Sequence, residues 1–199
     1  MKDFPKLPIL EVIPQLKDRL STAPIVLLHA PPGAGKSTLA PLTLMKENWL
    51  NGKKIIILEP RKLAAISIAQ RMAQLINEPV GESIGYRVRF NTCVGKNTRI
   101  EVITEGILTR MMQQDNGLEE VGLIVFDEFH ERSIHADLGL TIAREIQEVL
   151  RPDLKLLIMS ATLDSDDLSR NLKAPLVESS GRSFPVNIQY RAGSDLFNL

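Results

Sequence analysis

The sequence predicts an α/β domain built as a three-layer, doubly wound and mostly parallel sheet with helices on both faces. Short apolar segments alternate with longer amphipathic segments along the 199 residues. The apolar segments are hydrophobic at consecutive positions, which is typical of strands that are buried on both faces. The chain is long enough for one well-buried domain and too short for two α/β domains of full size.

The expected elements follow in chain order. Apolar residues recur at helical spacing between Ile9 and Leu20, with an interruption at Pro14, and predict a lead-in helix. The expected strands are Ile25–His29, Ile55–Leu58, Arg99–Ile103, Val121–Phe126 and Leu154–Met159. The expected helices between them are Ser37–Glu47, Leu63–Asn77, Ile107–Gln114 and Ala136–Leu150. In sheets of this kind, ligands bind beyond the carboxyl ends of the strands.

Composition excludes several classes of protein. Lys+Arg and Asp+Glu balance at 24 each, so any contact with nucleic acid must use a local basic patch. No apolar run approaches the roughly eighteen residues that span a bilayer, and we expect no membrane association. The single cysteine, Cys93, excludes a disulfide within the chain, and the first residues lack a secretory apolar stretch. These features predict a cytoplasmic protein.

A glycine-rich loop follows the first strand. Residues 30–37 read APPGAGKS, which matches the phosphate-binding pattern GxxxxGK[ST] except that Ala30 replaces the first glycine. Gly33 and Gly35 let backbone amides turn towards a phosphate, Lys36 reaches the β- and γ-phosphates, and the Ser37 hydroxyl can ligate Mg²⁺. The predicted nucleotide-binding residues are Gly33, Ala34, Gly35, Lys36, Ser37 and Thr38. The alternative is a glycine turn with an incidental lysine, but strand, loop and helix occur in the required order.

Two adjacent acids follow the strand Val121–Phe126. Asp127 is expected to hold Mg²⁺ directly or through water, and Glu128 to take a proton from the attacking water. The expected metal-site residues are Ser37, Asp127 and Glu128, and the expected catalytic residues are Lys36, Asp127, Glu128 and His130. The alternative is the solvated start of a turn. The phosphate-binding Lys36 lies 127 − 36 = 91 residues upstream in an alternating β/α chain, which favours the catalytic interpretation. A base beside the triphosphate favours hydrolysis over transfer to a second substrate.

Five ordered segments resemble one enzyme family. They are APPGAGKST (30–38), EPRKLAA (59–65), TEGILTR (104–110), DEFHERS (127–133) and MSATL (159–163), and they are similar to motifs I, Ia, Ib, II and III of the DEAH/RHA helicases of superfamily 2. With the segments GYRVRF (85–90) and GRSFPV (181–186), the chain looks most like the bacterial HrpB group. Phe129 departs from the alanine of the DEAH tetrad, while Asp127, Glu128 and His130 match it.

The resemblance implies a domain organisation and a set of roles. It implies a RecA-like ATP-binding domain over residues 23–179, preceded by the helical segment 1–22 and followed by 180–199 as the start of a linker to a second RecA-like domain. His130, Ser160 and Thr162 are implied to relay the nucleotide state to the strand-binding surface, although a lone histidine and small hydroxyls at strand ends are by themselves usually structural. Arg71 is implied to stack on the base, which tolerates other NTPs; the alternative is an ordinary exposed helix residue.

The same resemblance implies nucleic-acid contacts at motifs Ia and Ib. The implied residues are Arg61, Lys62, Thr104, Gly106 and Arg110. They combine cations with free amides at the starts of helices, which is suited to backbone phosphates and not to base sequence. Arg87 and Arg89 alternate on a probable strand and can extend this track, or form its solvated face. Backbone contacts suit single-stranded RNA or DNA alike, and the resemblance implies RNA.

The leading interpretation is therefore an ATP-dependent motor that moves along a single strand. A P-loop phosphotransferase acting on a small molecule is a rival, disfavoured by the basic helix starts. A nucleotide-binding module with negligible turnover is a second rival, because the family completes its active site with residues of the second RecA-like domain.

Overall fold

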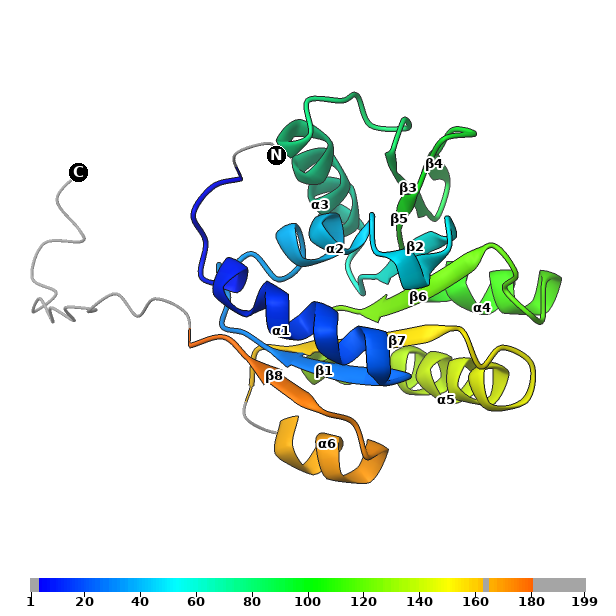
Figure 1. The fold of residues 1–199 in the computed structure, drawn as a ribbon. Coiled ribbons are helices and arrows are strands. Elements are labelled where there is room, and N and C mark those ends of the chain that lie inside the picture. The colour runs from blue at the N-terminus through cyan, green and yellow to red at the C-terminus, as the bar shows by residue number, and fades with distance from the viewer. Residues whose placement is uncertain (1–3, 163–164, 181–199) are drawn as a thin grey trace, which may run out of the picture.

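An eight-stranded sheet forms the centre of the computed structural model, which describes residues 4–162 and 165–180 (Figure 1). The strand order is β4-β3-β5-β2-β6-β7-β1-β8, and every pairing is parallel except the antiparallel pair β3 and β4. The strands are β1 (Ile25–His29), β2 (Lys54–Leu58), β3 (Ile84–Val88), β4 (Asn91–Cys93), β5 (Ile100–Ile103), β6 (Val121–Phe126), β7 (Lys155–Ser160) and β8 (Leu176–Glu178). The helices are α1 (Ile9–Thr22), α2 (Leu39–Leu44), α3 (Lys62–Leu75), α4 (Glu105–Gln114), α5 (Ile134–Val149) and α6 (Ser165–Leu172), with short 3₁₀ turns at Asn48–Leu50 and Phe129–Glu131.

Helices cover both faces of the sheet, as expected. Helices α1, α2 and α3 lie along one side in Figure 1, and α4, α5 and α6 lie along the other. Each face has its own apolar core. On β1, Val26 and Leu28 belong to the core under α1–α3, while Ile25 and Leu27 belong to the core under α4–α6. This two-sided burial explains why the strands are hydrophobic at consecutive positions.

The five expected strands and the lead-in helix are confirmed, and the other helices differ from expectation by at most three residues at either end. Helix α2 begins at Leu39 and not at Ser37, because residues 36–38 form turns. Pro41 lies in the first turn of α2, where a missing N–H breaks no helical bond. Pro14 lies within α1, which runs on through it.

Three elements were not predicted, namely β4, β8 and α6. Both strands are only three residues long, too short to show an alternating pattern. The predicted linker 180–199 and the GRSFPV segment lie outside the described residues, apart from Ser180.

Arg151 joins the loops at the amino edge of the sheet. Its Nη1 donates to the carbonyl oxygens of Gly117 and Leu118 at 2.8 and 2.7 Å, and its Nη2 donates to that of Val121 at 3.0 Å. The Asp153 carboxylate binds the same guanidinium at 2.7 and 2.8 Å. These bonds hold the pKa of Asp153 well below its usual range. The hydrogen bonds of Arg151 thus fix the connections that precede β6 and β7.

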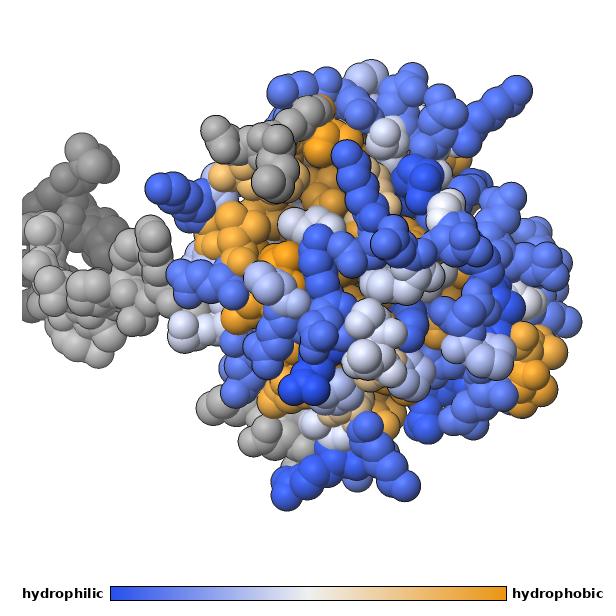
Figure 2. All heavy atoms as spheres, viewed as in Figure 1, coloured by the Kyte–Doolittle hydropathy of each residue, from blue (hydrophilic) through white to orange (hydrophobic). Residues whose placement is uncertain are grey.

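Polar and charged residues cover most of the face shown in Figure 2, with apolar residues gathered in patches between them. Among the residues described, no helix has both the length and the apolar character needed to cross a bilayer.

Candidate functional site

The parallel strands bring the predicted site residues to one edge of the sheet. Because β2 lies between β5 and β6, the segments that follow Ile103, Leu58 and Phe126 are neighbours. Backbone bonds extend this order beyond the strands: the Glu59 N–H donates to the Ile103 oxygen at 2.9 Å, and the Asp127 N–H donates to the Leu58 oxygen at 3.0 Å. The phosphate loop follows β1, two strands from β6.

The glycine-rich loop adopts a conformation that needs glycine at two positions. Gly33 and Gly35 have φ values of 78° and 94°, in the region that other residues rarely adopt. Lys36 is 4% exposed, and its Nζ donates to the Glu128 Oε1 at 2.9 Å. The loop and the two acids therefore form one site, although Lys36 and Glu128 are 92 residues apart in sequence.

One carboxylate oxygen of Asp127 is buried and has no hydrogen-bond partner among the residues that the structure describes. Its Oδ1 accepts a bond from the Glu128 N–H at 2.9 Å, whereas its Oδ2 is buried without a hydrogen-bond partner. Burial raises the pKa of Asp127 to about 6, while the Ser37 hydroxyl and the Lys36 ammonium act in the opposite direction. A free carboxylate oxygen near a serine hydroxyl is the oxygen-ligand arrangement that Mg²⁺ accepts, with the remaining ligands supplied by phosphates and water.

Glu128 is held in a left-handed backbone conformation, with φ 50° and ψ 36°. Its Oε1 accepts from Lys36, and its Oε2 lies 3.4 Å from the His130 Nδ1. Only Oε1 thus has a clear donor, because the His130 Nδ1 also lies 3.4 Å from the Ala161 N–H and one ring nitrogen cannot donate and accept at once. The arrangement suits Glu128 better to proton transfer than to metal ligation.

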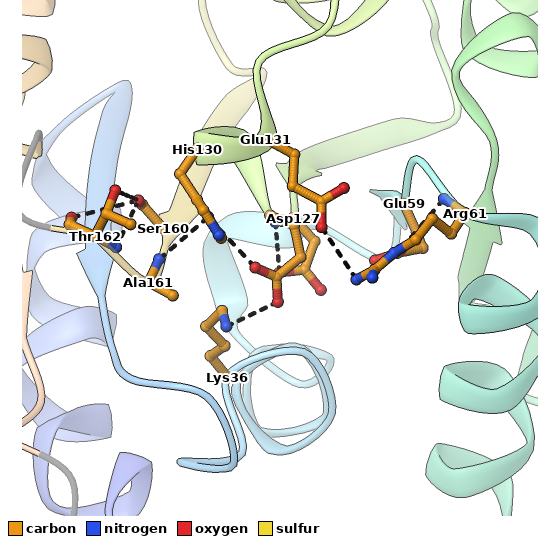
Figure 3. A network of polar contacts seen from close by, with 10 residues as sticks. Lys36, Glu59, Arg61, Asp127, His130, Glu131, Ser160, Ala161 and Thr162 are labelled. Carbon is orange, nitrogen blue, oxygen red and sulfur yellow. Dashed lines mark hydrogen bonds and ion pairs between the residues drawn. The ribbon is translucent and has the colours of Figure 1, made fainter.

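His130 connects the acids to the end of β7. The Ala161 N–H approaches the His130 Nδ1 at 3.4 Å. The Thr162 N–H donates to the Ser160 hydroxyl at 3.2 Å, and the two hydroxyls lie 3.4 Å apart. The three residues predicted to relay the nucleotide state therefore lie next to one another (Figure 3).

The sequence pattern did not identify Glu59 as a site residue, yet its side chain is 1% exposed at the edge of the sheet that carries Asp127. Burial, reinforced by the negative charge of Asp127, raises the pKa of Glu59 to about 7. Arg61 is its cation: the Arg61 backbone N–H lies 3.3 Å, and its Nε 3.5 Å, from the Glu59 Oε1. The Arg61 Nη2 also pairs with the Glu131 Oε1 at 3.2 Å. Like Asp127, Glu59 follows directly on a buried strand, and that signal was available in the sequence.

The predicted nucleic-acid residues are largely accessible. Arg61 and Lys62 are exposed at the start of α3, and Gly106 and Arg110 share an exposed face of α4 at i, i+4 spacing. Thr104 precedes α4, and its hydroxyl forms no capping bond with the helix.

The expectation for Arg87 and Arg89 was wrong in part. The strand β3 ends at Val88, so the two arginines do not alternate on one strand face. The Arg87 Nε instead binds the buried Glu101 at 2.6 Å, and the Arg89 guanidinium lies 4.8 Å from the centre of the Phe90 ring.

Arg71 is exposed on α3, nine residues beyond the first residue of that helix. Its side chain makes no polar contact with the part of the chain that the structure describes. Its role in binding the base stays a prediction.

Comparisons with known proteins place this site in a family. The DEAD/DEAH box helicase family matches residues 10–170. The chain is 58% identical over 185 residues to the ATP-dependent RNA helicase HrpB of Escherichia coli K12, a match that covers 92% of this chain and 23% of that protein. It is 37% identical over 188 residues to the ATP-dependent RNA helicase HrpA of the same organism, covering 93% of this chain and 14% of that protein.

The fold agrees with a solved structure. The crystal structure of the Escherichia coli DEAH/RHA helicase HrpB matches with a TM-score of 0.87 and 57% identity, covering 91% of this chain and 23% of that chain. This chain thus spans about a quarter of the length of that relative. The resemblance inferred from the five motifs is confirmed: the chain belongs to the DEAD/DEAH box helicase family, with a RecA-like α/β fold.

Proposed function

We propose that this chain is the ATP-binding domain of an ATP-dependent RNA helicase, the first of two RecA-like domains that together form the motor. One observation carries the proposal: Lys36 of the phosphate loop meets the Asp127–Glu128 pair, which comes from a different strand end. These are the groups that phosphoryl transfer to water requires, namely a cation for the phosphates, an acidic ligand for the ion and a base.

Each residue has a defined task in this reaction. The loop Gly33 to Thr38 binds the phosphates through amides that it does not use internally, such as that of Gly35, and Lys36 exchanges its bond with Glu128 for one with the triphosphate. The Ser37 hydroxyl and the free Asp127 oxygen would hold Mg²⁺, and the ion would supply charge neutralisation of the phosphates. Glu128, released from Lys36, takes the proton of the attacking water. We count Glu128 among the ion's neighbours and not among its direct ligands.

The strand-binding surface follows from the exposed residues at the same edge. Arg61, Lys62 and Arg110 present cations, and Thr104 presents a hydroxyl that no helix cap uses. Such groups bind backbone phosphates without reading sequence. The relatives at 58% and 37% identity are named RNA helicases, which favours RNA over single-stranded DNA as the partner.

The second domain is a proposal supported by length. The relatives are several times longer than this chain, and an arginine supplied by a partner element accelerates related reactions by roughly 10³–10⁵. We therefore expect residues 1–199 alone to bind nucleotide, to hydrolyse it feebly and not to unwind duplexes. The linker role of 180–199, the stacking role of Arg71 and the cytoplasmic location remain predictions.

The test is ATP turnover by the full-length protein with and without single-stranded RNA, with single-stranded DNA in a parallel arm. We expect turnover stimulated by RNA, lost in Lys36→Ala through weaker nucleotide binding and lost in Glu128→Gln with nucleotide binding retained. The chain offers a matched control, because Lys17 and Glu47 form a half-buried ion pair of 2.6 Å and neither residue lines the pocket at the phosphate loop. Lys17→Ala and Glu47→Gln should keep the full rate. Turnover that survives Glu128→Gln would contradict the assignment of the base.

A further inference from the structure

The segment ahead of α1 packs against the phosphate loop. The Ile9 backbone N–H donates to the Ala34 carbonyl oxygen at 3.1 Å. A Cβ at Gly35 would lie 2.9 Å from the Leu7 Cδ1 and 3.1 Å from the Ile9 Cγ2. Leu7 also lines the pocket formed by the loop, together with Lys36. Contacts from residues 7–9 thus converge on the Ala34–Gly35 peptide, about 25 residues away in sequence.

These contacts fix which way that peptide faces. All peptide bonds in the described chain are trans, so the carbonyl of Ala34 and the N–H of Gly35 point in opposite directions. The Ile9 N–H holds the Ala34 carbonyl on the side of α1, which turns the Gly35 N–H away from α1. The Ala34 N–H is used within the loop, where it donates to the Pro31 oxygen at 3.2 Å, whereas the Gly35 N–H has no acceptor among the residues described.

Without this restraint the Ala34–Gly35 peptide can adopt a second orientation. Glycine populates positive and negative φ about equally, so the Ala34–Gly35 peptide can rotate at low cost in a free loop. In the rotated state the Ala34 carbonyl, and not the Gly35 N–H, would face an anion. A loop held in the binding conformation avoids that ordering cost when the ligand arrives.

We infer that Leu7–Ile9 is a positioning element of the nucleotide site, which presents the Gly35 N–H to the phosphates of a nucleoside di- or triphosphate. The inference rests on the proposed binding of ATP and adds a segment that lies outside the five helicase motifs. The Ile9 N–H supplies the restraint, and the Leu7 side chain occupies the space into which a residue larger than glycine would project.

The decisive test removes the Ile9 N–H; it also weakens the Pro8 carbonyl, which accepts the Glu11 N–H at 3.1 Å, as an acceptor. An amide-to-ester replacement at Ile9 in the full-length protein deletes the donor to Ala34 and keeps the side chain. The matched control is the same replacement at Leu10, whose N–H donates to the Leu7 oxygen at the same distance of 3.1 Å. We expect the Kd for Mg-ADP, measured by calorimetry, to rise about threefold to tenfold at Ile9, the range of one net hydrogen bond, and less than about twofold at Leu10.

Enzyme kinetics distinguish the proposed positioning role of Leu7–Ile9 from a purely structural role of that segment. Because the Gly35 N–H binds phosphate in both ground and transition states, the Ile9 ester should raise the KM for ATP and leave kcat within about twofold. Leu7→Ala tests the side-chain contact without altering the backbone, and should raise the Kd for Mg-ADP at least about twofold, with Leu10→Ala as its control.

The outcomes separate the two proposals. If the unmodified protein does not bind Mg-ADP, the proposed function fails. If it binds, and the Ile9 ester and Leu7→Ala bind as tightly as their Leu10 controls, the nucleotide site stands and the positioning role is wrong.

Discussion

Replacing the buried Glu59 by glutamine should stabilise the protein in a pH-dependent way. Glu59 is 1% exposed, and burial beside Asp127 raises its pKa from 4.5 to about 7. The folded protein therefore binds this proton more tightly than the unfolded chain does. The contribution of the Glu59 carboxyl to the free energy of unfolding is fully present below pH 4.5, and it is lost as the pH rises to about 7. Glutamine keeps an oxygen for the Arg61 N–H and carries no charge.

The size of the effect follows from the two pKa values. A difference of about 2.5 units corresponds to at most ~3 kcal/mol at pH 8, where both states are ionised in full or nearly so. At pH 5 the same two pKa values correspond to a difference of less than ~1 kcal/mol in the free energy of unfolding. Glu59→Gln should thus raise the free energy of unfolding by up to these amounts, with the larger gain at pH 8.

Urea denaturation at the two pH values measures the gain. The control is Glu148→Gln on α5, where the side chain is 66% exposed and its pairing with Arg144 is worth under about 1 kcal/mol. A Glu59→Gln protein that is no more stable than the native protein at pH 8, or whose gain is the same at pH 5, would refute the argument from burial.

Three further predictions concern the amino edge, the strand-binding surface and the ion. Arg151→Ala should lower the free energy of unfolding by about 2–5 kcal/mol, because it removes three hydrogen bonds to carbonyl oxygens and the ion pair with Asp153. The control Arg144→Ala should change the free energy of unfolding by less than about 0.5 kcal/mol. Urea denaturation measures both. Arg61→Ala should weaken binding to single-stranded RNA of any sequence and reduce the slope of log K against log salt by about one, measured by fluorescence anisotropy; an unchanged slope excludes a phosphate contact. Asp127→Asn should abolish the strengthening of ADP binding by Mg²⁺ while binding without the ion persists, measured by calorimetry with and without EDTA; retained strengthening would assign the ion to other ligands.

Local pattern was sufficient for most of the fold. The strands β1, β2, β5, β6 and β7 were predictable because strands covered on both faces are hydrophobic at most consecutive positions, a signal carried by four to six residues. The three-residue strands β4 and β8 carry no such signal and form because a neighbouring strand offers its edge.

For the site, the sequence by itself determined the chemistry: a glycine loop that ends in Lys36 and a strand that ends in Asp127 and Glu128. Only the tertiary structure decided which groups lie close together in space. The order β5-β2-β6 sets Glu59 beside Asp127, and the path of α1 brings Ile9 to Ala34. The physical reason is that periodicity reports how each segment is buried, whereas strand order and the packing of distant segments depend on the free energy of the whole chain.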